Sequence, residues 1–163
     1  MPFSRSIRFL FASALLVGLP ALAATRTATF QVRAEITHDC TIAAADLNFG
    51  SIGLVSTSVD ATSTLTATCT NTTPYNLGLN AGTVTGSTIE NRLMASGPAT
   101  LRFQLYRDPA RAQIWGTTVG TNTQSGTGNG SAQSTTVYGR IPQQTPAPTP
   151  GVYTTTITVT VTY

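Results

Sequence analysis

The sequence predicts an all-β domain, a two-sheet sandwich of the immunoglobulin-like type. Apolar and polar residues alternate over short stretches, and 14 Gly and 9 Pro separate these stretches within only 163 residues. No stretch has the apolar period of an amphipathic helix. Apolar residues make up 40% of the chain, which is enough for one hydrophobic core. Short alternating strands divided by turns are typical of β-sandwiches.

The predicted surface is rich in hydroxyl groups and poor in charge. Charged residues make up 9% of the chain, against about 25% in an average soluble domain. The chain has 32 Thr, and a β-branched hydroxyl residue suits a half-exposed strand. All nine basic residues are Arg, and the net charge is only +3. No cluster of Arg with interleaved aromatic residues follows the N-terminal segment, so we expect no nucleic-acid partner.

The first 23 residues have the pattern of a secretory signal peptide. Arg5 and Arg8 precede an apolar run over residues 9–19, and Ala21 and Ala23 form a small-x-small cleavage pattern. We therefore expect cleavage after Ala23. The run of 11 residues is shorter than the roughly 20 that span a bilayer. The mature chain has no longer apolar run, so we expect an exported protein without a transmembrane segment.

Cys40 and Cys69 are the only cysteines in the chain. In an oxidising compartment two cysteines most simply form one disulfide, and two buried free thiols are the alternative. Their spacing fits no metal motif, and His38 is the only histidine, so we expect no metal and no cofactor. Catalysis is not expected either, because the chain has no Gly-x-Ser-x-Gly motif to present a nucleophile.

Alternation predicts the strands in order along the chain. Residues 28–36 place apolar side chains on one face and polar side chains on the other. The same period predicts strands over residues 63–70, 75–80, 101–106, 135–141 and 153–163. Residues 117–134 are rich in Gly, Thr, Ser and Asn and predict a loop. Residues 142–151 predict a proline-rich extended connector, and Trp115 is expected in the core.

The first and last predicted strands suit strand exchange between molecules. The first has an apolar face of Phe30, Val32, Ala34 and Ile36, and the last has one of Ile157, Val159, Val161 and Tyr163. An exposed sheet edge presents unpaired backbone groups that a strand from another molecule can satisfy. From these residues alone, a complete sandwich and an incomplete one remain equally open.

Several motifs occur in a fixed order along the mature chain. They are Leu-Asn-Phe-Gly at 47–50, Thr-Ala-Thr-Cys-Thr-Asn at 66–71, Leu-Tyr-Arg-Asp-Pro-Ala-Arg at 105–111, Tyr-Gly-Arg-Ile-Pro at 138–142, and the closing segment 151–163. With the two spaced cysteines, this combination resembles the spore coat protein U domain family. Members of that family include subunits of archaic, Csu-type chaperone-usher pili.

The resemblance implies an immunoglobulin-like fold that lacks its last strand. A periplasmic pilus chaperone, and later the N-terminal extension of another subunit, would complete the fold. The donor residues would be Phe30, Val32, Ala34 and Ile36, and the acceptor-groove edge would hold Ile157, Val159, Val161 and Tyr163. The expected organisation is a signal peptide (1–23), a donor extension (24–37) and one pilin domain (38–163). The Cys40 to Cys69 disulfide would be structural.

The implied function is that of a non-enzymatic pilus subunit at the cell surface, with a role in adhesion and biofilm formation. Its further partners would be an outer-membrane usher and other pilin subunits joined head to tail. A spore or cyst coat protein is an alternative within the same family. A self-contained secreted sandwich is another, in which Asn71, Asn80, Trp115 and Tyr138 would bind carbohydrate or a surface ligand.

Overall fold

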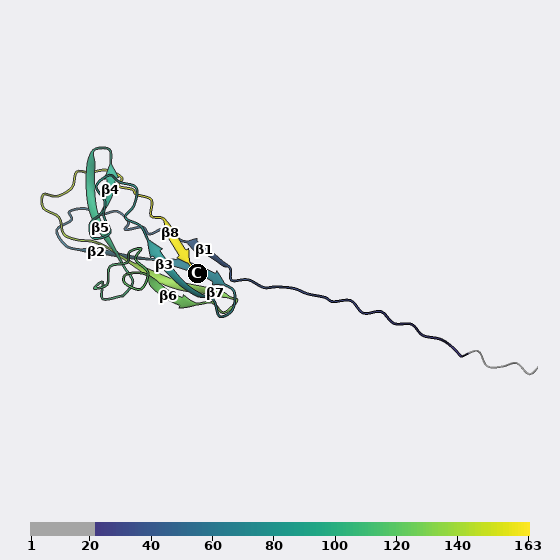
Figure 1. Cartoon of the computed structure of the whole chain (residues 1–163). Coiled ribbons are helices and arrows are strands. Elements are labelled where there is room, and N and C mark those ends of the chain that lie inside the picture. Colours follow the sequence, from purple (N-terminus) through teal and green to yellow (C-terminus); the bar gives the residue numbers. More distant parts are fainter. Residues whose placement is uncertain (1–21) are drawn as a thin grey trace, which may run out of the picture. The chain divides into compact units, whose positions relative to one another are not determined.

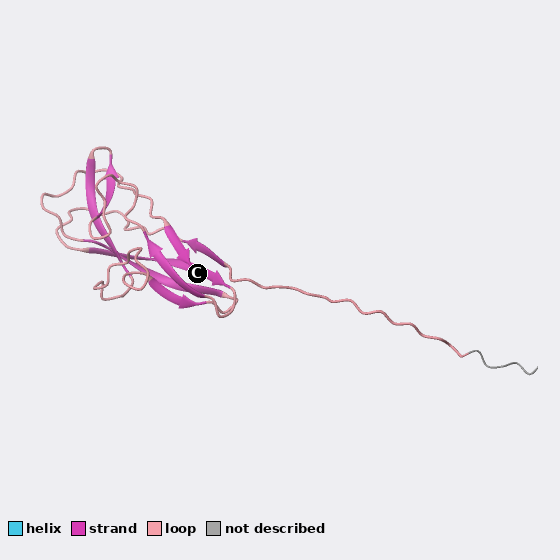
Figure 2. Cartoon of the chain, viewed as in Figure 1, coloured by secondary structure: helices cyan, strands magenta, loops and turns pink. Residues whose placement is uncertain are grey.

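The structure is a computed structural model that describes residues 22–163. Most of the expected signal peptide lies outside the described residues. Glu35–Tyr163 forms one compact unit, and the residues before Glu35 belong to a separate unit. No strand forms over residues 28–36, which Figure 2 draws as loop. The predicted strand is absent there because a strand needs a hydrogen-bonded neighbour, and its alternating side chains are exposed instead.

The compact unit consists of antiparallel strands in two sheets (Figure 1). The strands are β1 (Cys40–Ala44), β2 (Val59–Cys69), β3 (Pro74–Leu79), β4 (Arg92–Ser96), β5 (Ala99–Tyr106), β6 (Gln124–Thr127), β7 (Ala132–Ile141) and β8 (Val159–Thr162). One sheet has the order β1-β2-β7-β5-β4 and the other the order β6-β3-β8. Residues 22–163 contain no helix, so the predicted all-β class is confirmed.

Apart from residues 28–36, each alternating segment that was predicted as a strand contains a strand in the structure. β2, β3, β5, β7 and β8 overlap the predicted strands, whereas β1 and β4 were not predicted. The predicted loop 117–134 contains β6 and the start of β7, so that prediction is wrong for residues 124–127 and 132–134. Gly126 lies under the ring of Tyr75, where an added Cβ would come within 2.4 Å of Tyr75 Cζ. The glycine therefore makes room for a buried ring on the neighbouring strand.

The core lies between the two sheets. Its buried members are Val55, Leu65, Ala67, Cys69, Tyr75, Leu77, Leu79, Leu101, Phe103, Leu105, Trp115, Val137 and Ile141. Trp115 is fully buried, and its indole Nε1 donates to the Leu77 carbonyl at 2.8 Å. Because that hydrogen bond satisfies the polar atom of the ring, the whole side chain is accommodated in the core, as predicted.

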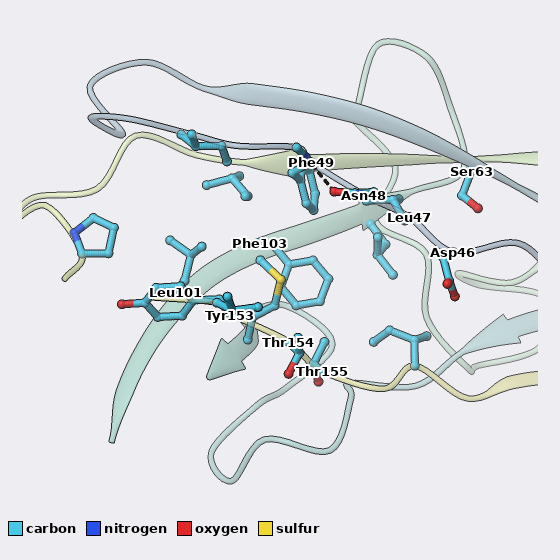
Figure 3. Close-up of a pocket in the computed structure, with 18 of the residues that line it drawn as sticks. Asp46, Leu47, Asn48, Phe49, Ser63, Leu101, Phe103, Tyr153, Thr154 and Thr155 are labelled. Carbon is cyan, nitrogen blue, oxygen red and sulfur yellow. Dashed lines mark hydrogen bonds between the residues drawn. The ribbon is translucent and has the colours of Figure 1, made fainter. Parts of the chain in front are cut away.

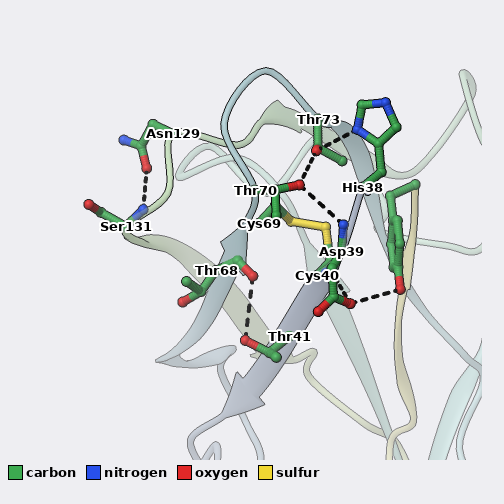
Figure 4. Close-up of a disulfide and its surroundings, with 11 residues drawn as sticks. His38, Asp39, Cys40, Thr41, Thr68, Cys69, Thr70, Thr73, Asn129 and Ser131 are labelled. Carbon is green, nitrogen blue, oxygen red and sulfur yellow. Dashed lines mark hydrogen bonds between the residues drawn. A yellow bond between two sulfur atoms is a disulfide. The ribbon is translucent and has the colours of Figure 1, made fainter. Parts of the chain in front are cut away.

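The disulfide joins β1 to β2 at the pair where their ladder begins (Figure 4). Cys40 and Cys69 lie opposite each other with their Cα atoms 4.1 Å apart. The disulfide prediction is therefore confirmed, and the free-thiol alternative is wrong. His38 Nδ1 lies 2.8 Å from the hydroxyl of Thr73, a buried residue. The only histidine thus takes part in a local hydrogen bond beside the disulfide.

Replacing both cysteines with alanine is expected to lower the free energy of unfolding by about 3.5 kcal/mol. The reason is that the disulfide closes a loop of 29 residues and restricts the unfolded chain. Urea unfolding of the oxidised protein and the double variant measures the difference. A loss below about 1 kcal/mol would contradict this account of the disulfide.

Candidate functional site

The core is open along one side of the compact unit, where an apolar groove with a volume of about 1250 Å³ reaches it. One wall is formed by residues 44–55 and the other by residues 147–157 together with Val159. Core side chains from both sheets form the floor. They are Leu65, Leu79, Met94, Leu101, Phe103, Leu105, Val137 and Ile141. Figure 3 shows Leu101 and Phe103 between the two walls.

The first wall continues from the end of β1 without forming a strand. Leu47 and Phe49 pack against Gly139 of β7, where an added Cβ would lie 2.8 Å from Leu47 Cδ1 and 3.0 Å from Phe49 Cζ. The Asn48 side-chain oxygen accepts from the Gly50 N–H at 2.7 Å, and Gly50 has a positive φ of 75°. These contacts turn the wall over the sheet and leave the side chains of Leu47 and Phe49 half-buried.

The second wall passes from one sheet to the other. Thr154 exchanges two backbone hydrogen bonds of 3.0 Å with Ala95 of β4. Farther along the chain, the wall becomes β8, which pairs with β3. Before the bridge, the Tyr153 hydroxyl donates to the Thr149 carbonyl at 2.7 Å. Figure 3 shows Tyr153, Thr154 and Thr155 across the groove from Leu47 and Phe49.

β8 offers an unpaired edge to the groove. Within residues 22–163 it is hydrogen-bonded to β3 alone, while β1 lies beside it in the other sheet. The Thr158 carbonyl accepts a hydrogen bond from the Asn80 N–H, so Thr158 faces β3. Because successive residues of an antiparallel strand point their backbone groups to opposite sides, the N–H and C=O groups of Val159 and Val161 point away from β3. The edge therefore presents backbone donors and acceptors next to an apolar floor. An extended peptide strand with alternate apolar side chains has the complementary groups.

Of the predicted edge residues, Ile157 and Val159 line this groove, and Val161 and Tyr163 follow them along the same segment. Ile157, Val159 and Val161 are half-buried, and Tyr163, at the end of the edge, is 55% exposed. The predicted strand 153–163 is shortened to β8, because residues 155–158 lie between the bridge at Thr154 and the β3 ladder.

The predicted donor residues stand exposed in the N-terminal segment. Phe30, Val32 and Ile36 are 87%, 86% and 89% exposed, and Ala34 is exposed as well. Three large apolar side chains at alternate positions are thus left without cover.

Sequence reasoning missed most of the groove. It identified the edge strand and the apolar step Leu47 to Phe49, but not the wall that this step builds. It also missed Met94 and the fact that Leu101 and Phe103 open to the groove. Alternation reports which face of a strand is apolar, but not whether another element covers that face.

Charge is concentrated away from the groove. Of the described residues that line it, Asp46 alone is charged. On β2, Asp60 accepts two hydrogen bonds from Arg140 of β7, at 2.7 and 2.8 Å, and Arg111 Nε lies 3.3 Å from the same carboxylate. The hydrogen bond with Arg140, aided by the charge of Arg111, lowers the pKa of Asp60 below 3.8.

The described part of the chain has neither a cluster of metal ligands nor a membrane-spanning helix. No three His, Cys, Asp or Glu side chains within residues 22–163 gather where they could hold a metal ion. None of these residues forms a helix of the length and apolar character needed to cross a membrane.

Comparison with known proteins gives one family and one fold. The family model described as Spore Coat Protein U domain matches residues 26–160. Among solved structures, the chain is similar to one in the chaperone-tip adhesion subunit pre-assembly complex, CsuC-CsuE, from archaic chaperone-usher Csu pili of Acinetobacter baumannii. The sequence identity is 24% and the TM-score 0.56. The match covers 78% of this chain and 40% of that chain. No curated protein matches.

Acidification is expected to remove a contribution of Asp60 to stability. Because the folded-state pKa of Asp60 is lowered, this contribution is present above pH 3.8 and is lost as the pH falls through the folded-state value. The carboxylate is partly exposed, so the contribution should be below about 1 kcal/mol. Urea unfolding from pH 6 to pH 2, with Asp60→Asn for comparison, measures it. Equal pH dependence in both proteins would contradict the prediction.

Proposed function

Since the chain belongs to the Spore Coat Protein U domain family, we propose that it is a structural subunit of a chaperone-usher pilus that polymerises by strand donation. In this proposal, Phe30, Val32, Ala34 and Ile36 of one copy fill the apolar groove of the next. The observation that carries the proposal is the presence of both halves in one chain. These halves are an exposed alternating apolar segment and an open groove with an unpaired strand edge.

The chemistry of the two halves is complementary. A strand in the groove would bond through its backbone to the free groups of Val159 and Val161. Its apolar face would cover Leu101 and Phe103, while polar residues such as Gln31 would face the solvent. The burial of apolar surface from both partners would drive the association, at roughly 25 cal/mol per Å² before the entropic cost of association.

Head-to-tail donation makes an open filament. The donor segment and the groove are different surfaces of the subunit, so the contact is heterologous, and repeated heterologous contacts that do not close into a ring build fibres. Each copy in the fibre would therefore act once as donor and once as acceptor. The expected product is a homopolymer or a mixed fibre of related subunits.

An incomplete core needs protection before assembly. We infer that a periplasmic pilus chaperone occupies the groove first, and that an outer-membrane usher then directs exchange with the donor segment. The support for the chaperone is the fold shared with a chain of a chaperone-subunit complex, together with the apolar groove that reaches the core. An unprotected apolar groove with an open edge would promote aggregation in the periplasm.

The proposed location is the cell surface, after export through the periplasm. The expected signal peptide and the family membership support this location. A role in surface adhesion and biofilm formation follows from a fibre at that site. The Thr-rich, weakly charged sequence would give such a fibre an exterior dominated by hydroxyl groups.

Stability of the chain is expected to require a strand in the groove. Residues 24–163 would be expressed in a periplasm alone, with the candidate chaperone, and with a second copy of residues 24–37 joined after Tyr163 by a flexible linker. Only the chaperone complex and the self-complemented form should be soluble and show a cooperative thermal transition. If the plain chain is an equally stable monomer, the sandwich is complete and the search should turn to a self-contained binding module.

Charge on the apolar face of the donor segment is expected to prevent polymerisation. Val32→Asp would bury a carboxylate, whereas the control Gln31→Asp would place the same charge on the solvent face of the same segment. The uptake of a synthetic 24–37 peptide by the chaperone complex should fall by about 100-fold or more for Val32→Asp, since each 1.4 kcal/mol is tenfold. Gln31→Asp should stay within about threefold of the original peptide, since surface substitutions change little. Equal losses for the two peptides would contradict a donor segment that turns Val32 into the groove and Gln31 toward the solvent.

A further inference from the structure

The last hydrogen-bonded pair between β3 and the groove edge is completed by a side chain. The Asn80 N–H donates to the Thr158 carbonyl at 3.1 Å. In return, the Thr158 N–H donates to Asn80 Oδ1 at 2.9 Å. In a regular antiparallel pair this second bond would go to the main-chain carbonyl of Asn80. The side-chain oxygen therefore takes the place of the backbone oxygen.

The main-chain carbonyl of Asn80 is held by Arg92. Arg92 is fully buried, and its Nε donates to that carbonyl at 2.9 Å. The remaining N–H groups of the guanidinium donate to the carbonyls of Ile89, Leu79 and Trp115 and to the side-chain oxygen of Gln104. Because a buried cation is unfavourable unless it is hydrogen-bonded, all five donors keep these oxygens turned toward Arg92.

Burial also sets the charge state of this guanidinium. Desolvation lowers the pKa of Arg92 to about 10, while the charge of Glu90 opposes the shift. Arg92 therefore stays protonated at neutral pH. Its hold on the Asn80 carbonyl is a charge-assisted hydrogen bond, which is stronger than a neutral one.

Asn80 is also the point at which the chain leaves the sheet. Its Oδ1 accepts a second hydrogen bond, from the Gly82 N–H at 3.1 Å, and Gly82 has a positive φ of 98°. A Cβ at Gly82 would come within 2.7 Å of Thr155 Oγ1 on the groove edge. One amide oxygen thus joins the turn after β3 to the edge that follows Thr154.

The edge has few other ties in this region. Thr154 is bridged to Ala95, and Thr160 is paired with β3. Between these two points, the other hydrogen bonds formed within the described residues are two contacts with Thr83, both 3.3 Å long. The bonds of Asn80 to Thr158 are shorter, at 2.9 and 3.1 Å. Asn80 is therefore the main hydrogen-bonding restraint on residues 155–159. This segment lies beside the groove and leads into β8.

We propose that Asn80, oriented by Arg92, is a positioning residue for strand acceptance that sets the register of the groove edge at Ile157 and Val159. This inference rests on the proposed function. A slip of one residue along a strand moves its apolar side chains to the opposite face. With Thr158 held in place, an incoming strand meets one arrangement of backbone groups. Without this restraint, the edge frays and acceptance slows.

The test compares three variants of the full chain, each purified as its complex with the periplasmic chaperone. Asn80→Ala removes the acceptor oxygen. Asn80→Asp keeps an oxygen that accepts from the Thr158 and Gly82 N–H groups. Asn129→Ala is the matched control, since Asn129 Oδ1 accepts from the Ser131 N–H at 2.9 Å in the turn between β6 and β7. A synthetic peptide of residues 24–37 is added in excess, and the release of chaperone is followed.

Relative to the unaltered chain, Asn80→Ala should slow peptide uptake by about tenfold, the effect of losing the hydrogen bond that holds the Thr158 N–H on the groove edge. Asn80→Asp and Asn129→Ala should each stay within about threefold. If Asn80→Ala and Asn129→Ala take up peptide equally and the unaltered chain takes it up normally, this inference is overturned but the proposed function is not. If the unaltered complex takes up no peptide, the proposed function fails, and the inference fails with it.

A second measurement applies whether or not Asn80→Ala forms a chaperone complex. In the self-complemented form, amide hydrogen exchange is followed with and without Asn80→Ala. Faster exchange confined to residues 155–159 supports the positioning role. Equal acceleration across β3 and β6 indicates a general loss of stability and overturns it.

Discussion

The feature on which the rest of the structure depends is the open edge of β8. The smaller sheet has the order β6-β3-β8, so among the strands that the structure describes β8 has a hydrogen-bonded partner on one side only. The core beneath this edge lacks a covering strand, and the side chains of Leu101 and Phe103 line a groove instead of a closed interior. Both the backbone edge and the apolar floor lack a partner for the same structural reason. In the proposed function, a single extended segment would satisfy both.

The groove is kept open by elements that are fixed elsewhere. Leu47 and Phe49 rest on Gly139, and the opposite wall is tied to Ala95 and Asn80. The buried Arg92 holds the end of β3 by donating to several carbonyls at once. These ties let the walls keep their positions although no strand lies between them. An acceptor that is organised in advance loses less conformational entropy when it binds.

The alternation of residues predicted the strands whose two faces differ. Apolar residues are buried at alternate positions in the second half of β2 and in the second half of β7, so the period of these strands was visible. β6 was missed because Gly126 lies beneath Tyr75, and a glycine-rich stretch otherwise predicts a loop. β4 was missed because Arg92 is buried at a position where a charged residue predicts exposure. In both strands a contact with a distant residue outweighs the local pattern.

By itself, the sequence determined the all-β class, the strands with clear alternation, the pairing of Cys40 with Cys69 and the apolar face of the N-terminal segment. These features depend on neighbouring residues or on the small number of cysteines. Only the tertiary structure decided which strand edge stays unpaired, which core residues open to the groove and that Asn80 completes the ladder. The pairing of strands joins residues far apart in the chain, and the period of a single strand carries no record of its neighbours.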